Sequence, residues 1–395
     1  YQQHTADSKQ SEYEKYAVND SFYHFIFLHK FAPYMAVYRG FFQGYDDMRP
    51  TAISQVLEQL IRAVLIIVAA YVLVKMELST EIVAGGVMIG SVLGALASLI
   101  YLRFKYQRSS LKVQSGENYT SRDFSTWSGT ILKISIPIAI GSVTMALFNF
   151  VDSFTVTYSL KQIGVTAQQE INYLYGLYGR GVTLVQITTV FASSIILPLV
   201  PLITKKLAQK DVDGTRSVIE QTYRMTHLIT WPAAMGLLAL TLPLNLALYT
   251  NVEGSSMLAI INASAVFTSL TLVSTGILQG MNFAKFAAYL IIAGVGLKIV
   301  LNIILIQQFG LDGAAWSTLI VYAVVFILNT IFILRKIRFS AWNATTLKIV
   351  VSSIVMAVVV GLPTLWLDVE NWGRLLALGY VFLGIAVGAV VYFAL

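Results

Sequence analysis

The stretch that decides the fold reads Arg39-Gly-Phe-Phe-Gln-Gly-Tyr-Asp-Asp-Met-Arg-Pro-Thr-Ala-Ile-Ser-Gln-Val-Leu-Glu-Gln-Leu-Ile-Arg62. It follows an apolar and aromatic run, residues 22–38, that has the length of a membrane-spanning helix. Small and polar residues are expected to end this helix in a turn: Arg39, Gly40, Gln43 and Gly44. Pro50 has no amide hydrogen and suits the first turn of the next helix. The stretch therefore predicts a tight turn between two spans.

The second of these helices carries charge deep into an apolar segment. Residues 51–74 are long enough to cross a hydrocarbon core at about 1.5 Å per residue, yet polar side chains lie mostly along one stripe. Measured from Pro50, Glu58 lies about 12 Å and Arg62 about 18 Å along the helix. A charge at that depth costs roughly 2.5–3.5 kcal/mol, so the stripe is expected to face other helices or a watery cavity.

Two interpretations of this stripe remain open. Glu58 and Arg62 are four residues apart with the acid first, which is the favourable order for an ion pair that holds the helix to its neighbours. Alternatively, Arg62 lines a polar path for a substrate.

These residues also carry a resemblance. Residues 39–44, 48–52 and 54–62 resemble the stage V sporulation protein B group of polysaccharide-type transporters, which belongs to the MOP flippase superfamily together with lipid II flippases and multidrug extruders. In that family about three helices precede this region, so the resemblance implies that they are missing ahead of Tyr1. The remaining segments follow the family's order to near the C-terminus.

The composition identifies the broad class. Of 395 residues, 56% are hydrophobic and only 12% are charged, with a mean hydropathy of +0.70, far from the quarter of charged residues usual in soluble domains. The net charge of +7 is explained by basic loops rather than by nucleic-acid binding. The absence of cysteine excludes disulfides and cysteine-based metal sites. An integral, multi-pass membrane protein is expected, and the resemblance implies that it lies in the bacterial cytoplasmic membrane.

Apolar runs bounded by polar loops predict an all-α bundle of eleven spans. They lie near residues 22–39, 51–74, 81–102, 129–155, 174–203, 218–249, 256–280, 285–306, 312–334, 345–367 and 374–394. The predicted organisation is an external loop (1–21), the rest of an N-terminal lobe (22–103), a cytoplasmic loop (104–128), a six-span C-terminal lobe (129–338) and two extra spans (339–395). The two longest runs, 174–203 and 218–249, are expected to include tilt or interfacial turns. Lysine and arginine gather in alternate loops, which places those loops in the cytoplasm.

An internal repeat supports two similar lobes. Gly40-Phe-Phe-Gln-Gly44 reappears as Gly276-Ile-Leu-Gln-Gly280, and at the same offset Arg62 aligns with Lys298. Both basic residues lie deep in their helices, so they are predicted to face each other across the path between the lobes, where an anionic head group would bind.

Three further basic or acidic residues are candidates for function. Arg180 lies within a long apolar run, and its fork can hold two phosphate oxygens. In the lipid II flippases the corresponding helix carries a cavity-lining arginine, although the acidic residue beside it is Gly179 here. Asp152 either pairs with Arg180 or binds a coupling cation. Lys30 either points into the cavity or extends to the head groups.

Small residues mark packing faces rather than active sites: Gly86, Gly90 and Gly94, and Gly384 and Gly388. In the lipid II flippases the last two helices form a groove for the polyprenyl tail. The resemblance implies that role for residues 345–367 and 374–394, whose apolar character permits it.

The predicted function is a flippase for a lipid-linked anionic glycan precursor, such as lipid II or a similar polyprenyl-diphosphate oligosaccharide. Its expected partners are this substrate, membrane lipids and a coupling cation, and a monomer without cofactor, metal, nucleic acid or enzymatic activity is expected. No nucleotide-binding glycine-rich loop is found. Two alternatives remain: a cation-coupled multidrug extruder, which needs carboxylates such as Glu58 and Asp152, and a non-transporting scaffold for cell-wall or spore-coat assembly.

Overall fold

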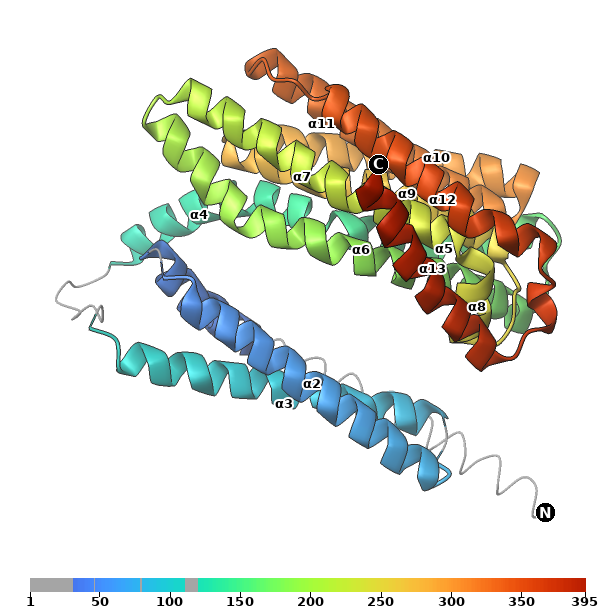
Figure 1. The fold of residues 1–395 in the computed structure, drawn as a ribbon. Coiled ribbons are helices and arrows are strands. Elements are labelled where there is room, and N and C mark those ends of the chain that lie inside the picture. The colour runs from blue at the N-terminus through green and yellow to red at the C-terminus, as the bar shows by residue number, and fades with distance from the viewer. Residues whose placement is uncertain (1–30, 46, 79, 111–119) are drawn as a thin grey trace, which may run out of the picture. The chain divides into compact units, whose positions relative to one another are not determined.

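The computed structural model describes residues 31–45, 47–78, 80–110 and 120–395, and it divides the chain into two compact units, Tyr1–Asn118 and Tyr119–Leu395. Helices make up almost all of the described residues (Figure 1). Each unit is considered separately below.

The first unit is built around two long antiparallel helices, α2 (Arg49–Lys75) and α3 (Thr80–Gln107), which pack along their length. A further helix covers residues 31–44. The prediction that Gly40 breaks this helix is wrong, because the helix continues through Arg39 and Gly40 and ends at Gly44. Pro50 lies in the first turn of α2, where its missing amide hydrogen leaves no helical bond unmade.

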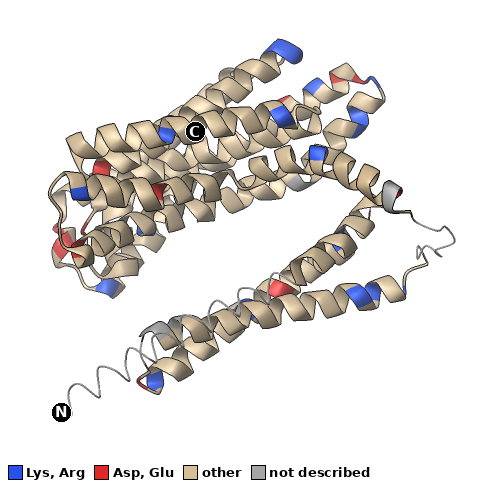
Figure 2. Cartoon of the chain, turned by 180° about the vertical axis from the view of Figure 1, so that it is seen from behind, with Lys and Arg blue, Asp and Glu red and all other residues tan. Residues whose placement is uncertain are grey.

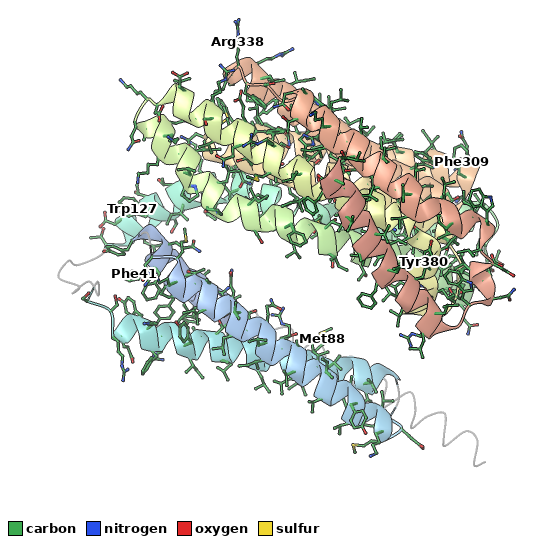
Figure 3. All side chains as sticks on the ribbon, viewed as in Figure 1. Phe41, Met88, Trp127, Phe309, Arg338 and Tyr380 are labelled. Atoms are coloured by element: carbon green, nitrogen blue, oxygen red, sulfur yellow. The ribbon has the colours of Figure 1, made fainter. Side chains whose placement is uncertain are left out.

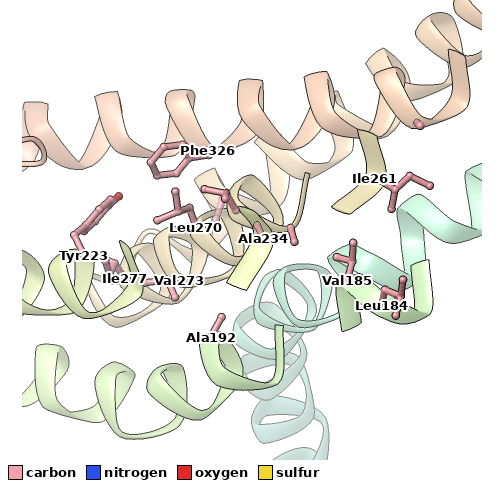
Figure 4. Packing of buried hydrophobic residues seen from close by; sticks show 14 of the residues in the cluster. Leu184, Val185, Ala192, Tyr223, Ala234, Ile261, Leu270, Val273, Ile277 and Phe326 are labelled. Carbon is pink, nitrogen blue, oxygen red and sulfur yellow. The ribbon is translucent and has the colours of Figure 1, made fainter. Parts of the chain in front are cut away.

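The second unit is a bundle centred on α9 (Ser255–Gly280). About 67% of the apolar window of α9 is buried, against 28% for α10 (Ala284–Phe309), so α9 is the inner helix of the bundle. It packs against α6 (Gln168–Ala208), α7 (Val212–Ala239) and α11 (Leu311–Lys336). Figure 4 shows this core, in which Val273 and Ile277 of α9 lie among side chains from α6, α7 and α11.

Two of the predicted spans are broken helices. Residues 129–155 were predicted as one span, but α4 (Ser121–Ser142) and α5 (Thr144–Gln162) meet at a 62° bend. The bend follows the pair Gly141–Ser142, a sequence at which helices commonly kink.

The second break separates α7 from α8 (Thr241–Tyr249), with a bend of 74°. Its cause is Pro243, whose ring would clash with the carbonyl group four residues earlier, at Ala239, where α7 ends. The predicted run 218–249 therefore consists of a span and a short turned helix.

Three N-terminal caps fix where helices begin. Thr120 and Asp123 form a capping box at α4, Asp211 accepts a hydrogen bond from the Gly214 amide at α7, and Asn343 accepts one from the Thr346 amide at α12 (Ala344–Trp366). Such caps satisfy amides that have no partner within the helix.

The last two helices belong to the second unit. α12 packs on α7, and α13 (Arg374–Ala394) packs on α12 and α8. A short 3-10 turn, η1 (Val369–Asn371), connects them. Phe309 and Arg338, at the two ends of the α11 region, mark opposite ends of this bundle in Figure 3.

Among the described residues, eight helices are long and apolar enough to cross a membrane, or up to ten if each bent pair is one span. The first predicted span, 22–39, is described only from residue 31. Charged residues gather at helix ends, while the helix middles are nearly free of them (Figure 2). The multi-pass helical fold predicted from the sequence is confirmed.

Candidate functional site

The polar stripe of α2 is part of an ion cluster in the first unit. Glu58 Oε1 lies 2.7 Å from Arg62 Nη2, so the predicted pair is present. Glu58 Oε2 lies 2.9 Å from Arg39 Nη2, and Arg39 also donates to Ser54 Oγ and Ser98 Oγ. Two guanidinium groups therefore share one carboxylate, which leaves surplus positive charge inside the helical part of this unit.

Arg39 thus has a different place from the one predicted. It was expected to be a turn residue, but its side chain reaches α2 and α3 and is only 20% exposed. Since its helix continues past it, Arg39 lies one turn inside the helix end, from where its long side chain can reach Glu58.

The glycine ladder of α3 explains how the two helices come close enough for this cluster. A Cβ atom added to Gly94 would lie 2.7 Å from the Glu58 carbonyl oxygen, and one added to Gly90 would lie 3.2 Å from the Arg62 carbonyl oxygen. Only residues without a side chain allow the α3 backbone to approach α2 at these levels.

The second unit holds a buried ion pair. Lys298 Nζ on α10 lies 3.0 Å from Asp152 Oδ1 on α5, with side chains 0% and 2% exposed. Asp152 therefore pairs with Lys298, and the predicted pairing with Arg180 is wrong. The prediction that Lys298 presents a free cation to a head group is also wrong, because its ammonium group is enclosed and neutralised.

Hydrogen bonds complete the environment of this pair. Tyr178 of α6 donates to Asp152 Oδ2 at 2.8 Å, and Asn302 of α10 donates to Asp152 Oδ1 at 2.8 Å. Lys298 donates to Thr318 Oγ1 of α11 at 2.7 Å. Four helices thus meet at one ion pair, whose carboxylate accepts three hydrogen bonds.

Arg180 lies elsewhere on α6 and has neutral partners. Its Nη1 donates to Asn251 Oδ1 at 2.7 Å and to Asn245 Oδ1 at 3.3 Å, and its guanidinium carbon lies 4.7 Å from the centre of the Tyr249 ring. Among the described residues, no carboxylate lies within ion-pair distance of Arg180. The fork is held in place while its charge remains uncompensated.

An apolar groove of about 460 Å³ lies between α6, α7, α12 and α13. Its walls include Ile187 and Phe191 of α6, Met356 and Val360 of α12 and, from α13, Gly384, Gly388, Ala389 and Tyr392. The glycines keep α13 close to α12, since a Cβ atom at Gly388 would lie 3.3 Å from Met356 Cγ. Leu244, the neighbour of Asn245, also lines the groove.

Several residues of these sites were not found from the sequence. Asn302 lies four residues after Lys298, on the same helical face, and this spacing was the available signal. Tyr178, Thr318 and Asn251 carry no such signal, because they meet their partners only through the packing of distant helices. Lys30 lies outside the described residues, so its predicted role stays a prediction.

Several known proteins are similar to this chain in sequence. Residues 12–207 match the family described as polysaccharide biosynthesis protein. The uncharacterised membrane protein YabM of Bacillus subtilis is 31% identical over 85% of this chain, and the chain spans 63% of that relative's length. The lipid II flippase MurJ of the same organism is 27% identical over 91% of the chain and 69% of its own length. The stage V sporulation protein B of that organism is 30% identical over 48% of the chain and 36% of its own length.

A solved structure shows the same fold. The lipid II flippase MurJ in an inward closed conformation superposes with a TM-score of 0.62, covering 92% of this chain and 70% of that one at 17% identity. The predicted resemblance is confirmed: the chain is a multi-pass membrane protein that is similar to the polysaccharide biosynthesis protein family over residues 12–207 and has the fold of the lipid II flippase MurJ.

Proposed function

We propose that this protein is a flippase that moves a lipid-linked anionic glycan precursor, a polyprenyl-diphosphate oligosaccharide such as lipid II, to the outer leaflet of the bacterial cytoplasmic membrane by alternating access. Such a substrate is an amphiphile with a doubly phosphorylated head and a long apolar tail. A protein that moves it needs a cation that is not already neutralised and an apolar surface nearby.

The arrangement of α6 carries this proposal. Arg180 and the groove residues Ile187 and Phe191 are seven and eleven residues apart, which places all three on one helical face. Along the axis they span about 10–17 Å. One face of α6 therefore presents a cation that could bind the head group and, next to it, the wall of an apolar groove.

The geometry of Arg180 suits a phosphate. The guanidinium group stacks on the Tyr249 ring, and its Nη1 donates hydrogen bonds to two side-chain amide oxygens. These contacts orient the guanidinium plane. A planar fork of this kind binds phosphate oxygens in pairs, and ordering it in advance reduces the entropy lost on binding. The surplus charge of the Arg39, Glu58 and Arg62 cluster in the first unit favours an anion as well.

The multidrug extruder is less well supported. A cationic drug needs an accessible carboxylate, but Glu58 lies between two arginines and Asp152 is enclosed with Lys298. Both acidic residues on which that alternative depends are already compensated. Transport without chemical change of the substrate also makes this protein a transporter rather than an enzyme.

The test is a leaflet assay for lipid II in cells depleted of their own flippase, with the protein expressed from its complete reading frame. Arg180→Ala is expected to lower outward lipid II at least tenfold at equal membrane levels, because the oriented cation is lost. Arg216→Ala, which removes an exposed arginine paired with Glu220, is the matched control and is expected to retain transport. Full transport by Arg180→Ala would favour the scaffold or a different site.

A second pair of variants tests the groove. Ala389 lines the groove, whereas Ala386 lies on the same helix and does not. Ala389→Trp is expected to fill the groove and reduce transport severalfold, while Ala386→Trp leaves it near wild type. Equal transport by the two variants would remove the groove from the mechanism and leave the role of Arg180 intact.

A further inference from the structure

The loop between α8 and α9, residues 250–254, carries an acidic residue close to Arg180. Asn251 in this loop accepts the 2.7 Å hydrogen bond from Arg180 Nη1. Two residues later comes Glu253, which is exposed and whose carboxylate accepts a hydrogen bond from the hydroxyl group of Tyr173 on α6. Among the described residues, no cation lies within ion-pair distance of Glu253. One short loop therefore supplies a neutral partner to Arg180 and also holds a carboxylate that has no cation.

Asn245 of α8 joins Arg180 to the main chain of Glu253. Its Oδ1 accepts a hydrogen bond from Arg180 Nη1 at 3.3 Å, and its Nδ2 donates to the carbonyl oxygen of Glu253 at 2.9 Å. Asn245 is fully buried, and its Nδ2 also donates to Ser255 Oγ at 3.0 Å, so the amide group is held in place. The main chain of Glu253 therefore lies one amide group away from the guanidinium group, a separation that the flexible side chain of a glutamate can largely span.

Tyr173 lies on the face of α6 that carries Arg180. The two residues are seven positions apart, which is two helical turns and about 10 Å along the axis. Two lysines in the last turn of α6 place that end in the cytoplasm, so Tyr173 lies on the outer side of Arg180. The apolar groove begins on the opposite side, at Ile187. A head group that leaves Arg180 in the outward direction therefore passes Tyr173 and Glu253.

The backbone of this loop turns sharply at both ends. Thr250 and Gly254 have positive φ angles of 65° and 68°, in the left-handed region. Glycine adopts this region freely, but a β-branched threonine does so rarely and under strain. The contacts of Asn251 and Glu253 with α6 help to hold the loop in this shape. Exchanging these contacts would allow the strained backbone to relax.

We propose that Glu253 competes with the anionic head group for Arg180 and so releases the head group on the outer side of the membrane. In the structure, Tyr173 holds the carboxylate and Arg180 has neutral partners, so the charge of Arg180 is available to a diphosphate. When Glu253 leaves Tyr173 and pairs with Arg180, the diphosphate loses its cation, because carboxylates and phosphates bind the same guanidinium fork. This inference rests on the function proposed above and adds the residue that ends substrate binding.

The competing explanation is a static hydrogen bond that fastens the loop to α6. A static bond predicts that Tyr173→Phe and Glu253→Gln change anion binding in the same direction or not at all. Competition predicts opposite directions. Tyr173→Phe frees the carboxylate for Arg180 and weakens anion binding, whereas Glu253→Gln removes the competitor and strengthens it. A glutamine oxygen still accepts the tyrosine hydrogen bond, so Glu253→Gln preserves the loop.

The experiment measures the dissociation of radiolabelled farnesyl diphosphate from the purified protein, produced from its complete reading frame and reconstituted in lipid nanodiscs. Glu253→Gln is expected to slow dissociation by about threefold or more, and Tyr173→Phe is expected to accelerate it by about twofold or more. The double variant should behave like Glu253→Gln, because the tyrosine then has no competitor to restrain. Glu370→Gln is the matched control, since it removes an equal charge from another exposed acid of the same unit and should leave the rate unchanged.

Two results would overturn this inference alone, provided that Arg180→Ala abolishes binding of the probe. One is a Glu253→Gln protein that releases farnesyl diphosphate as fast as the wild type. The other is a Tyr173→Phe protein whose dissociation rate shifts in the same direction as that of Glu253→Gln. If instead the wild type binds no farnesyl diphosphate, or Arg180→Ala binds it equally well, the proposed function fails at its cation and this inference fails with it.

Discussion

The two units place a basic residue at matching positions of the internal repeat but compensate it differently. Arg62 of α2 shares Glu58 with Arg39, and these side chains are 12–29% exposed. Lys298 of α10 is fully buried, and among the described residues it is the one cation paired with Asp152. One cluster therefore has surplus positive charge and is partly exposed, while the other is neutral and closed.

This difference separates two uses of charge within a membrane. An enclosed, neutral pair can fix helices but offers nothing to an anion. A cluster with more cations than carboxylates attracts anions, at the cost of stability. Arg180 lies in the same unit as Lys298 but lacks a carboxylate partner among the described residues. Its excess positive charge therefore resembles that of the cluster in the first unit.

The largest effect is expected from breaking the neutral pair. Asp152→Asn leaves the Lys298 charge buried and unpaired, which should cost about 3–5 kcal/mol of unfolding free energy. Glu58→Gln leaves two arginines that are less enclosed than Lys298, at 20% and 29% exposure against 0%, so its cost should be smaller. Reversible unfolding in mixed detergent micelles measures both.

A double variant checks the cause of the first effect. Asp152→Asn combined with Lys298→Met removes both charges and should recover most of the lost stability, because apolar packing can replace a buried ion pair. If Asp152→Asn and Glu58→Gln prove equally harmful, the distinction between the closed and the partly open cluster is wrong.

A smaller effect is expected at the helix contact that supports the charged cluster. Gly94→Ala places a methyl group 2.7 Å from the Glu58 carbonyl oxygen, so α2 and α3 must separate, at about 1–3 kcal/mol. Gly296→Ala on α10 is the matched control, since no atom lies within 4 Å of the added Cβ, and it should gain up to about 1 kcal/mol from helix propensity. Equal Tm values for the two variants would contradict this packing.

The sequence was informative where structure depends on nearby residues. Apolar runs located the helical regions from α2 to α13, although two of the runs each proved to be a bent pair of helices, and the spacing of Glu58 and Arg62 predicted their ion pair. The bend before α8 also had a local signal in the sequence, since the ring of Pro243 clashes with the carbonyl group of Ala239 in a straight helix.

The sequence was less informative where partners come from distant helices. Arg180 seemed the natural partner of Asp152, because both lie in consecutive predicted spans and bear opposite charge. The actual partner, Lys298, is brought to α5 by the packing of α10, which no local pattern encodes. Arg39 was misplaced because Gly40 suggested a helix end, although a glycine within a helix costs only about 1 kcal/mol.

The smallest effect should come from making the two clusters more alike. Arg62→Lys keeps the positive charge beside Glu58. Arg62 uses Nη2 for its bond to Glu58, while its buried Nε has no partner among the described residues, so the fork is only partly used. A loss below about 1 kcal/mol of unfolding free energy is therefore expected.

The reciprocal change, Lys298→Arg, forces a larger side chain into a site with 0% exposure and should cost about 1–3 kcal/mol. The same chemical exchange would then have unequal costs at two matching positions of one repeat, and equal costs would mean that the site around Lys298 is less tightly enclosed than its contacts indicate.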